Sequence, residues 1–381
     1  MVTVFTTDAA FLSPLDRFLE GICRRLQLTP TQYELAKSHY EAVGNWLEQE
    51  DSILAPYRPV IYPQGSLPMG TTNKPLDKEE YDLDFICELA IPWWKIHPND
   101  LLSKVEFRIR QHQDYASRLK RGKRCLRITY AHNFHLDIVP ACSHSALGQG
   151  QVRIPDRELE GWRDSNSRKY IDWFSQQAEK VQQEASSRRT DYAEPLPLQE
   201  SLEDKPVLKC AVQLVKRYRD IAFKNMPDVA PVSIVLSTLC ADHYQGQNSV
   251  SEAVASILDG MAMSIAQHQG KRLQVWNPAN KVSEDLGERW DDAKAYSRFL
   301  IWVKAFRKLW QQLTDARGYS EISSLLEALF GEQPTKDVIR EDAIQLTQHR
   351  TNGQLGVLTG TGMLTSQPNA IRSPKNTFYG R

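Results

Sequence analysis

The sequence lacks long hydrophobic runs, clustered cysteine pairs and an excess of charge of either sign. No window approaches 18 uninterrupted apolar residues, and residues 1–18 lack a basic region followed by an apolar run. We therefore expect neither secretion nor a membrane span, and a cytoplasmic location. Lysine plus arginine equals aspartate plus glutamate, at 47 residues each, so no overall field attracts nucleic acid or an anionic membrane.

Cysteine is scattered through the 381 residues, and its six positions show no C-x-x-C spacing. In a chain of this size the pattern predicts reduced, mostly buried thiols. The nearest candidate for a metal cluster consists of His132, His135, Cys142 and His144. Because this run overlaps an expected strand and its turn, we favour no metal there.

Hydrophobic periodicity divides the chain into a mixed region and a helical region. Residues 14–50 have helical spacing, whereas residues 56–75 have the proline and glycine content of a loop. Alternating patterns then predict three strands, at residues 81–89, 125–130 and 133–139. Beyond residue 200 we expect mainly helices, at about 206–223, 231–244 and 284–313.

Three aspartates carry the chemistry that this pattern predicts. Asp82 and Asp84 are two apart on an expected strand, so they point to the same face, roughly 7 Å apart. Asp137 lies on the polar face of a later strand with the same alternation. Three converging carboxylates raise one another's pKa values unless cations neutralise them. Two Mg²⁺ ions held by such carboxylates form a site for phosphoryl displacement, and Mn²⁺ can replace them.

A Gly-Ser turn upstream strengthens this interpretation. Gly65 and Ser66 begin the run QGSLPMGTT, in which glycine lets the backbone approach a phosphate and the hydroxyl can bind it. By itself each signal has an ordinary alternative, an acidic solvent face for the aspartates and a proline-rich loop for the turn. The order Gly-Ser, Asp-x-Asp and a later strand aspartate is much more specific.

Residues 63–89 (PQGSLPMGTTNKPLDKEEYDLDFICEL) resemble the DNA polymerase β-like nucleotidyltransferases, and more narrowly the bacterial cGAS/DncV-like nucleotidyltransferases (CD-NTases) of anti-phage CBASS signalling. The resemblance covers roughly residues 55–310 and includes further segments at 135–141, 153–174, 207–223, 232–244 and 275–290. It implies an α+β fold of two lobes, a nucleotidyltransferase core with a mixed sheet and a helical C-terminal lobe. The domains expected are 1–54 with a spine helix, 55–205 as the core, 206–340 as the helical lobe and 341–381 as a flexible tail.

The resemblance also implies a role for each matching residue. Gly65 and Ser66 match the motif that holds the donor triphosphate, Asp82 and Asp84 match the metal-binding pair, and Asp137 matches the acid that helps to activate the attacking hydroxyl. Two further residues match contacts to the triphosphate, Lys216 and Ser233. The sequence alone leaves a solvated lysine and a plain helix cap open for these two, and Lys209 ranks below Lys216.

The function expected from the resemblance is synthesis of a cyclic di- or trinucleotide messenger from nucleoside triphosphates, ATP among them, with release of pyrophosphate. One alternative is template-independent nucleotide addition to RNA or to a protein, because the same acids serve any acceptor. Another is a non-catalytic nucleotide-binding protein, which has no need to keep all three acids.

The expected partners follow from the same resemblance. They are the nucleoside triphosphates, a downstream effector that binds the cyclic product, and a ubiquitin-like conjugating partner acting on the C-terminus that ends in NTFYGR. The balanced charge and the absence of an obvious zinc-binding insertion argue against activation by DNA.

Overall fold

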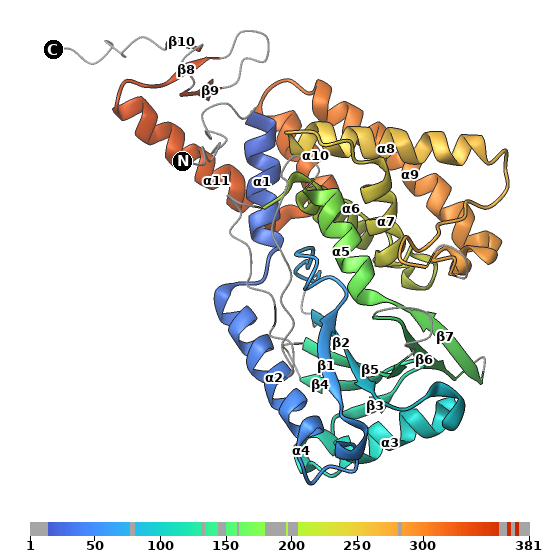
Figure 1. Ribbon diagram of the computed structural model, residues 1–381. Helices are drawn as coiled ribbons and strands as arrows, with labels where there is room; N and C mark the ends of the chain where they lie inside the picture. Colours follow the sequence, from blue (N-terminus) through green and yellow to red (C-terminus); the bar gives the residue numbers. More distant parts are fainter. Residues whose placement is uncertain are drawn as a thin grey trace, which may run out of the picture.

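The computed structural model describes residues 14–76, 81–130, 134–143, 150–157, 160–179, 196, 205–280, 284–357, 364–366 and 370–372. These residues form two stacked lobes, one built around a mixed sheet and the other helical (Figure 1). The α+β fold expected from the sequence is confirmed.

The sheet lobe contains seven described strands. Their order is β1 (Val60–Gln64), β2 (Tyr81–Leu89), β5 (Phe134–Ser143), β4 (Leu126–Tyr130) and β3 (Leu119–Arg121), with β6 (Val152–Asp156) paired to β5 and β7 (Gly161–Ser165) paired to β6. Strands β2 and β5 are parallel neighbours, whereas the other pairs are antiparallel. The sheet is therefore mixed, and its one parallel pair lies at the centre.

One face of this sheet is apolar and is covered by the helices α2 (Pro30–Glu48), α3 (Pro98–Arg110) and α4 (Gln113–Ala116). Helix α2 begins at a capping box, in which Thr29 and Gln32 satisfy each other's backbone N–H groups. The alternating residues Leu83, Phe85 and Cys87 of β2 pack into this core. The residues between them consequently point to the opposite face.

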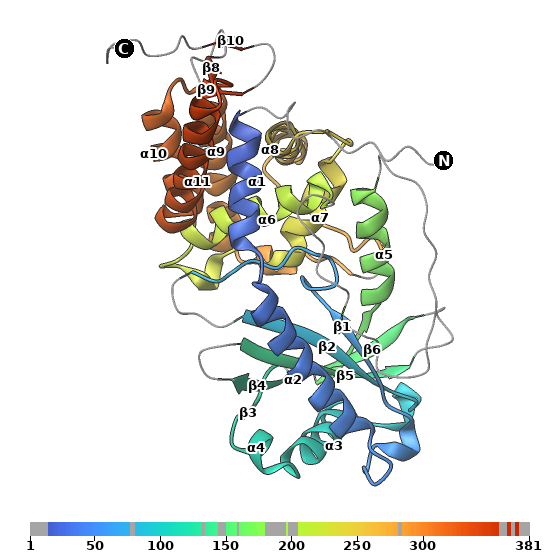
Figure 2. The same cartoon turned by 90° about the vertical axis from the view of Figure 1, so that its left-hand side faces the viewer.

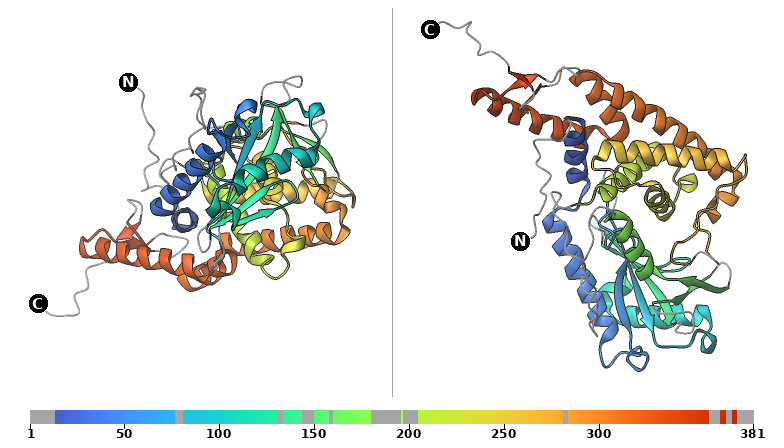
Figure 3. Two further views of the ribbon diagram at one scale, coloured as in Figure 1. Left: turned by 90° about the horizontal axis from the view of Figure 1, so that it is seen from below. Right: turned by 45° about the horizontal axis from the view of Figure 1, so that its top comes forward.

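Helices form the second lobe, and its described members are α1 (Pro14–Leu26), α5 (Ser167–Ala178), α6 (Val207–Ala222), α7 (Ser233–His243), α8 (Val250–Gln267), α9 (Ala293–Asp315), α10 (Tyr319–Phe330) and α11 (Glu332–Thr351). Helix α6 is central, and all of its residues from Leu208 to Tyr218 are buried. Helix α11 and the small sheet β8 (Gly356–Val357), β9 (Leu364–Thr365) and β10 (Ile371–Arg372) lie at the end far from the large sheet (Figures 1 and 3). No helix in the described ranges combines the length and the apolar character needed to cross a membrane.

Two expectations about the elements were wrong. Residues 60–64 form the edge strand β1 and not a loop, because an edge strand tolerates Pro63. The helix expected from residue 284 begins only at Ala293. The carboxylate of Asp285 accepts the backbone N–H groups of Val275 and Gly287, which fixes the preceding residues as a loop with a short 3₁₀ turn, η6 (Glu288–Asp291).

The expected C-terminal tail and the metal candidate are described only in part. Helix α11 runs without a break across residue 341, the expected start of the tail. His132 and His144 of the metal candidate, and the last nine residues, lie outside the described part of the chain. His135 and Cys142 both lie on β5.

Candidate active site

The three aspartates lie together on the polar face of the central parallel pair of strands. The register aligns Asp84 of β2 with Asp137 of β5, and Asp82 precedes Asp84 by one full alternation. Asp137 is buried, Asp84 is partly buried and the Asp82 side chain is 62% exposed. The carboxylates thus run from the interior of the lobe to its surface.

An arginine that we did not predict pairs with part of this cluster. Arg127 of β4 lies opposite Asp137 in the sheet and donates to both of its carboxylate oxygens, at 2.7 Å from Nε and 2.6 Å from Nη2. The same Nη2 lies 3.4 Å from Oδ1 of Asp82. The signal was present in the sequence, since Arg127 stands between the inward-facing Leu126 and Ile128.

The donor set fits a divalent cation. Burial, together with the charges of Asp137 and Asp82, raises the pKa of Asp84 to about 7, although Arg127 and Lys216 oppose the rise. A site so short of positive charge favours cations, and carboxylates are the ligands that Mg²⁺ prefers. As the side chains stand, no three acidic, histidine or cysteine side chains of the described chain are arranged around a common metal position. Both oxygens of Asp137 are directed at Arg127 instead.

The Gly-Ser turn lies directly beside Asp84. Gly65 has a φ of +75°, and a Cβ atom built on it would lie 2.7 Å from Oδ2 of Asp84. Only glycine lets the backbone approach the acid so closely without strain. The hydroxyl of Ser66 is 3.3 Å from that of Thr72, and the carbonyl of Ser66 accepts the N–H of Thr71, so the turn closes on itself.

Helix α6 fixes this turn from the other lobe. Lys216 is buried and its Nζ donates to the carbonyl of Thr71 at 2.8 Å. The side chain of Asn73 donates to the carbonyl of Gln213, and the side chain of Gln213 donates to the carbonyl of Thr72, both at 2.8 Å. Burial lowers the pKa of Lys216 to about 8, and Arg219 adds to the effect. Lys216 is therefore not a solvated lysine, the alternative that the sequence left open.

Ser233 is the first residue of α7, and Val232 occupies the N-cap position without a side-chain cap. The hydroxyl of Ser233 accepts a hydrogen bond from Nη2 of Arg219 at 3.2 Å, and Nη1 of Arg219 donates to the carbonyl of Pro231 at 2.8 Å. The helix N-terminus thus presents uncapped N–H groups beside a guanidinium, which suits an anionic group. We did not predict Arg219, which lies three residues after Lys216 on α6.

A cleft of about 730 Å³ between the lobes is lined by six of the seven predicted residues, namely Gly65, Ser66, Asp82, Asp84, Lys216 and Ser233. Asp137 is not part of its described lining and lies beneath Arg127. Residues that we did not predict also line the cleft, among them Asn166, Arg219, Asn277, Glu284 and Arg289. The volume suits ligands larger than a single sugar or amino acid.

A polar sheet face with Asp-x-Asp on one strand and a third aspartate on its parallel neighbour, next to a Gly-Ser turn, defines a nucleotidyltransferase of the polymerase β type. Comparison with known proteins narrows this class. The family described as "Second Messenger Oligonucleotide or Dinucleotide Synthetase domain" matches residues 14–178. A c-di-GMP synthase of Roseivirga ehrenbergii is 31% identical over 369 residues, covering 96% of this chain and 97% of that protein.

The chain belongs to the CD-NTases, within the DNA polymerase β-like nucleotidyltransferases. The cyclic dinucleotide synthase CdnG of Bradyrhizobium diazoefficiens is 29% identical over 77% of this chain and 75% of its own. A structure of CdnG from this species in complex with GTP matches with a TM-score of 0.72 at 25% identity, over 87% of this chain and 99% of the other. The expected enzyme class, cyclic oligonucleotide synthase, is confirmed, and nucleotide addition to RNA or protein is not favoured. The roles of the individual residues stay predictions.

Proposed function

We propose that the protein joins two nucleoside triphosphates, at least one of them GTP, into a cyclic dinucleotide that signals phage infection. One observation carries the proposal: Asp84 and Asp137 are aligned on parallel strands beside the Gly65 turn, at a cleft large enough for nucleotides. GTP is favoured because the relatives named above are a c-di-GMP synthase and a CdnG whose structure is in complex with GTP.

In this proposal the chain binds the donor triphosphate at the junction of the two lobes. Ser66 and the backbone of its turn contact the terminal phosphates, and Lys216 supplies a positive charge from below. The N-terminus of α7 with Ser233 and Arg219 provides a second anion-binding position. These groups hold the α-phosphorus in line with the attacking hydroxyl, which is most of what the protein contributes to this reaction.

Asp82, Asp84 and Asp137 would hold Mg²⁺ or Mn²⁺. When bound, such ions lower the pKa of the attacking hydroxyl and neutralise the pyrophosphate that leaves. The ribose oxygen forms a bond to the α-phosphorus, the bond to the bridging oxygen breaks, and the hydroxyl proton passes toward the carboxylate of Asp137. Arg127 must first release that carboxylate, because it now occupies both oxygens. The same step, repeated on the linear intermediate, closes the ring.

We further expect the enzyme to work in the cytoplasm, where its substrates are, and to act through an effector that binds the cyclic product. A conjugating partner acting on the C-terminal residues remains part of this proposal. Removal of residues 361–381 should then leave synthesis intact and abolish conjugation, whereas loss of both would assign the tail a structural role.

Mass spectrometry of the reaction products tests the proposal. Purified protein is incubated with the four nucleoside triphosphates, singly and mixed, with Mg²⁺ or Mn²⁺, and the products are treated with phosphatase. We expect a phosphatase-resistant cyclic dinucleotide containing guanine, absent with the Asp82→Ala/Asp84→Ala variant. Linear products alone would refute cyclisation, and unchanged activity of Asp137→Ala would refute the assignment of the third acid.

A further inference from the structure

The loop between α8 and α9 brings a carboxylate to the cleft. Asn277, Glu284 and Arg289 of this loop line the same cleft as Asp82 and Asp84. The hydroxyl, the lysine and the helix N-terminus assigned above to the triphosphate are contributed by other elements, namely the Gly65 turn, α6 and the start of α7. A carboxylate repels phosphates, so the part of a nucleotide that Glu284 meets is its sugar or its base.

Glu284 is held rigidly by Asn277. Oε2 of Glu284 accepts a hydrogen bond from Nδ2 of Asn277 at 2.7 Å, and the backbone carbonyl of Glu284 accepts the N–H of Asn277 at 2.9 Å. Asn277 is only 4% exposed, and its side-chain oxygen accepts the N–H of Ala279 at 2.9 Å. The amide orientation is therefore fixed, and no hydrogen bond from the described residues reaches Oε1 of Glu284.

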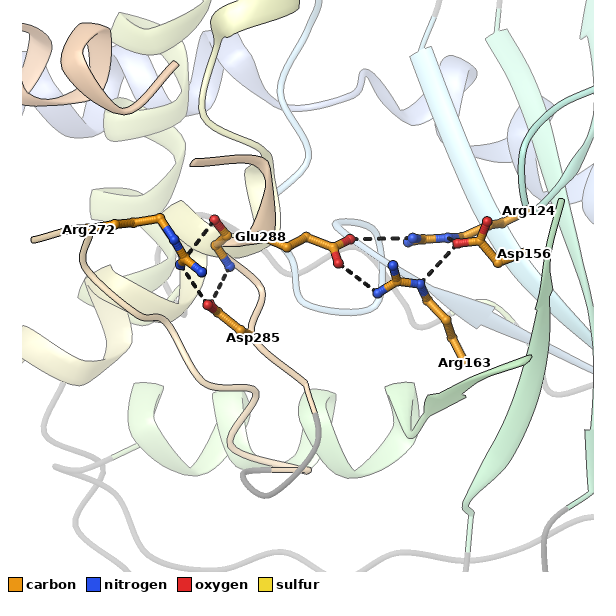
Figure 4. A network of polar contacts seen from close by, with 7 residues as sticks. Arg124, Asp156, Arg163, Arg272, Asp285 and Glu288 are labelled. Atoms are coloured by element: carbon orange, nitrogen blue, oxygen red, sulfur yellow. Dashed lines mark hydrogen bonds and ion pairs between the residues drawn. The ribbon is translucent and has the colours of Figure 1, made fainter. Parts of the chain in front are cut away.

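A clasp between the lobes fixes the segment that carries Glu284 (Figure 4). Glu288 accepts hydrogen bonds from Arg163 at 2.7 Å and from Arg124 at 3.4 Å, and both arginines bind the fully buried Asp156, at 3.0 and 2.8 Å. Burial raises the pKa of Glu284, but the charges of Arg124 and Arg163 oppose the rise. The clasp thus holds the segment that carries this carboxylate at a fixed position, and its two arginines favour the ionised form.

Asp285, the residue after Glu284, is constrained as well. Arg272 donates to Oδ2 of Asp285 at 2.6 Å, while Oδ1 of Asp285 accepts the N–H of Gly287 at 2.8 Å (Figure 4). Glu284 therefore directly precedes two polar anchors, Asp285 and Glu288. A ligand-binding group that is positioned before the ligand arrives discriminates better than a mobile one.

An ionised carboxylate offers only hydrogen-bond acceptors, with about four lone-pair sites. Guanine presents its N1–H and its N2 amino group side by side, two donors that one carboxylate accepts together. Adenine and cytosine place a ring-nitrogen acceptor beside their amino group, and uracil flanks its N3–H with two carbonyl oxygens. A carboxylate facing these edges meets a repulsive acceptor, which disfavours them.

We propose that Glu284 determines base specificity by accepting the N1–H and N2 amino hydrogens of guanine, with Asn277 and the Glu288 clasp as positioning residues. This inference rests on the proposed function, because it takes the cleft to bind nucleoside triphosphates.

Calorimetric titration with the α,β-methylene analogues of GTP, ITP and ATP tests the inference without requiring turnover. Inosine lacks only the N2 amino group of guanosine, so the two share the sugar and the phosphates. We expect the wild-type protein to bind the GTP analogue about tenfold more tightly than the ITP analogue, and Glu284→Gln to reduce this ratio to about one. Glu288→Gln loosens the clasp that positions Glu284 and should lower the GTP-over-ITP ratio in part. Asp259→Asn is the matched control, since this exposed carboxylate pairs with Arg307 and is not part of the described lining of the cleft, and it should leave all three affinities unchanged.

Several outcomes would overturn the inference. Equal binding of the GTP and ITP analogues by the wild-type protein is one, and it requires no variant to fold. An unchanged ratio of GTP-analogue to ITP-analogue affinity in Glu284→Gln is another. If Glu284→Gln instead lost affinity for both analogues equally, Glu284 would be assigned to the ribose. Because this assay measures binding and not turnover, the two proposals can fail separately. If the guanine preference depends on Glu284 but the enzyme forms no cyclic product, the proposed function is refuted and the role of Glu284 is not.

Discussion

Arg127 competes with divalent cations for the aspartates, and its removal should tighten cation binding. Its guanidinium binds both oxygens of Asp137 and lies 3.4 Å from Asp82, so a cation must displace it or share the carboxylates with it. A unit charge and a doubly charged cation about 5 Å apart repel each other by about 7 kcal/mol at an effective dielectric constant of about 20, and by about 2 kcal/mol in water. Because 38% of the Arg127 side chain is exposed, screening reduces this repulsion to about 1–2 kcal/mol.

That repulsion corresponds to about 5- to 30-fold in a dissociation constant. Mn²⁺ binding to the nucleotide-free protein, followed by electron paramagnetic resonance of the free ion, should therefore be tighter by this factor in Arg127→Gln. Arg121→Gln is the matched control, since Arg121 lies on the neighbouring strand β3 and pairs with Glu106 at 3.1 Å. Equal or weaker Mn²⁺ binding in Arg127→Gln, compared with the control, would refute the competition.

Three further predictions concern the site and the clasp. A methyl group at Gly65 would lie 2.7 Å from Oδ2 of Asp84, so Gly65→Ala should lower kcat/KM about 100-fold. Gly270→Ala is the control, because Gly270 has a similar φ of +81° and no described atom lies within 4 Å of the added methyl group. It should leave kcat/KM unchanged, and an equal fall in kcat/KM for both variants would contradict a role for the contact between Gly65 and Asp84. Since cations bind ionised Asp84, whose pKa is about 7, Mn²⁺ affinity should fall about tenfold per pH unit below pH 6; an affinity that is flat down to pH 5 would disprove this. Asp156→Asn leaves two partly buried arginines, Arg124 and Arg163, underpaired and should lower the free energy of unfolding in urea by about 1–3 kcal/mol. Glu288→Gln should lower it by less than about 1 kcal/mol, and the reverse order would contradict the clasp.

The sequence was sufficient for the strands that carry the acids, because the alternation of Leu83, Phe85 and Cys87 with Asp82 and Asp84 reflects one buried and one polar face. It was also sufficient to expect the third acid in the same sheet. It did not show that β2 and β5 are parallel neighbours, since strand order depends on long-range pairing and not on local pattern.

Other parts depended on contacts that the local pattern does not encode. The residues before Ala293 have apolar spacing compatible with a helix, but hydrogen bonds from Val275 and Gly287 to Asp285 hold them as a loop. Glu284 consequently lies in the cleft and not on a helix face. Arg127 and Arg219 lie on a strand and a helix that the sequence predicts. Their hydrogen-bond partners could not be predicted, because these lie on neighbouring elements.

The two N-terminal helices belong to different hydrophobic cores, although only three residues separate them. Helix α1 packs with the helical lobe and α2 with the sheet (Figure 2). Where α1 ends, the carbonyl of Leu26 accepts the N–H of Lys74. The carbonyl of Lys74 in turn accepts a hydrogen bond from Arg217 of α6 at 3.1 Å. Any rocking of one lobe against the other therefore bends the chain at a point tied to the segment that follows the Gly-Ser turn. A protein or small molecule that binds the outer ends of α1 and α2 can therefore change the position of the phosphate-binding groups without entering the cleft.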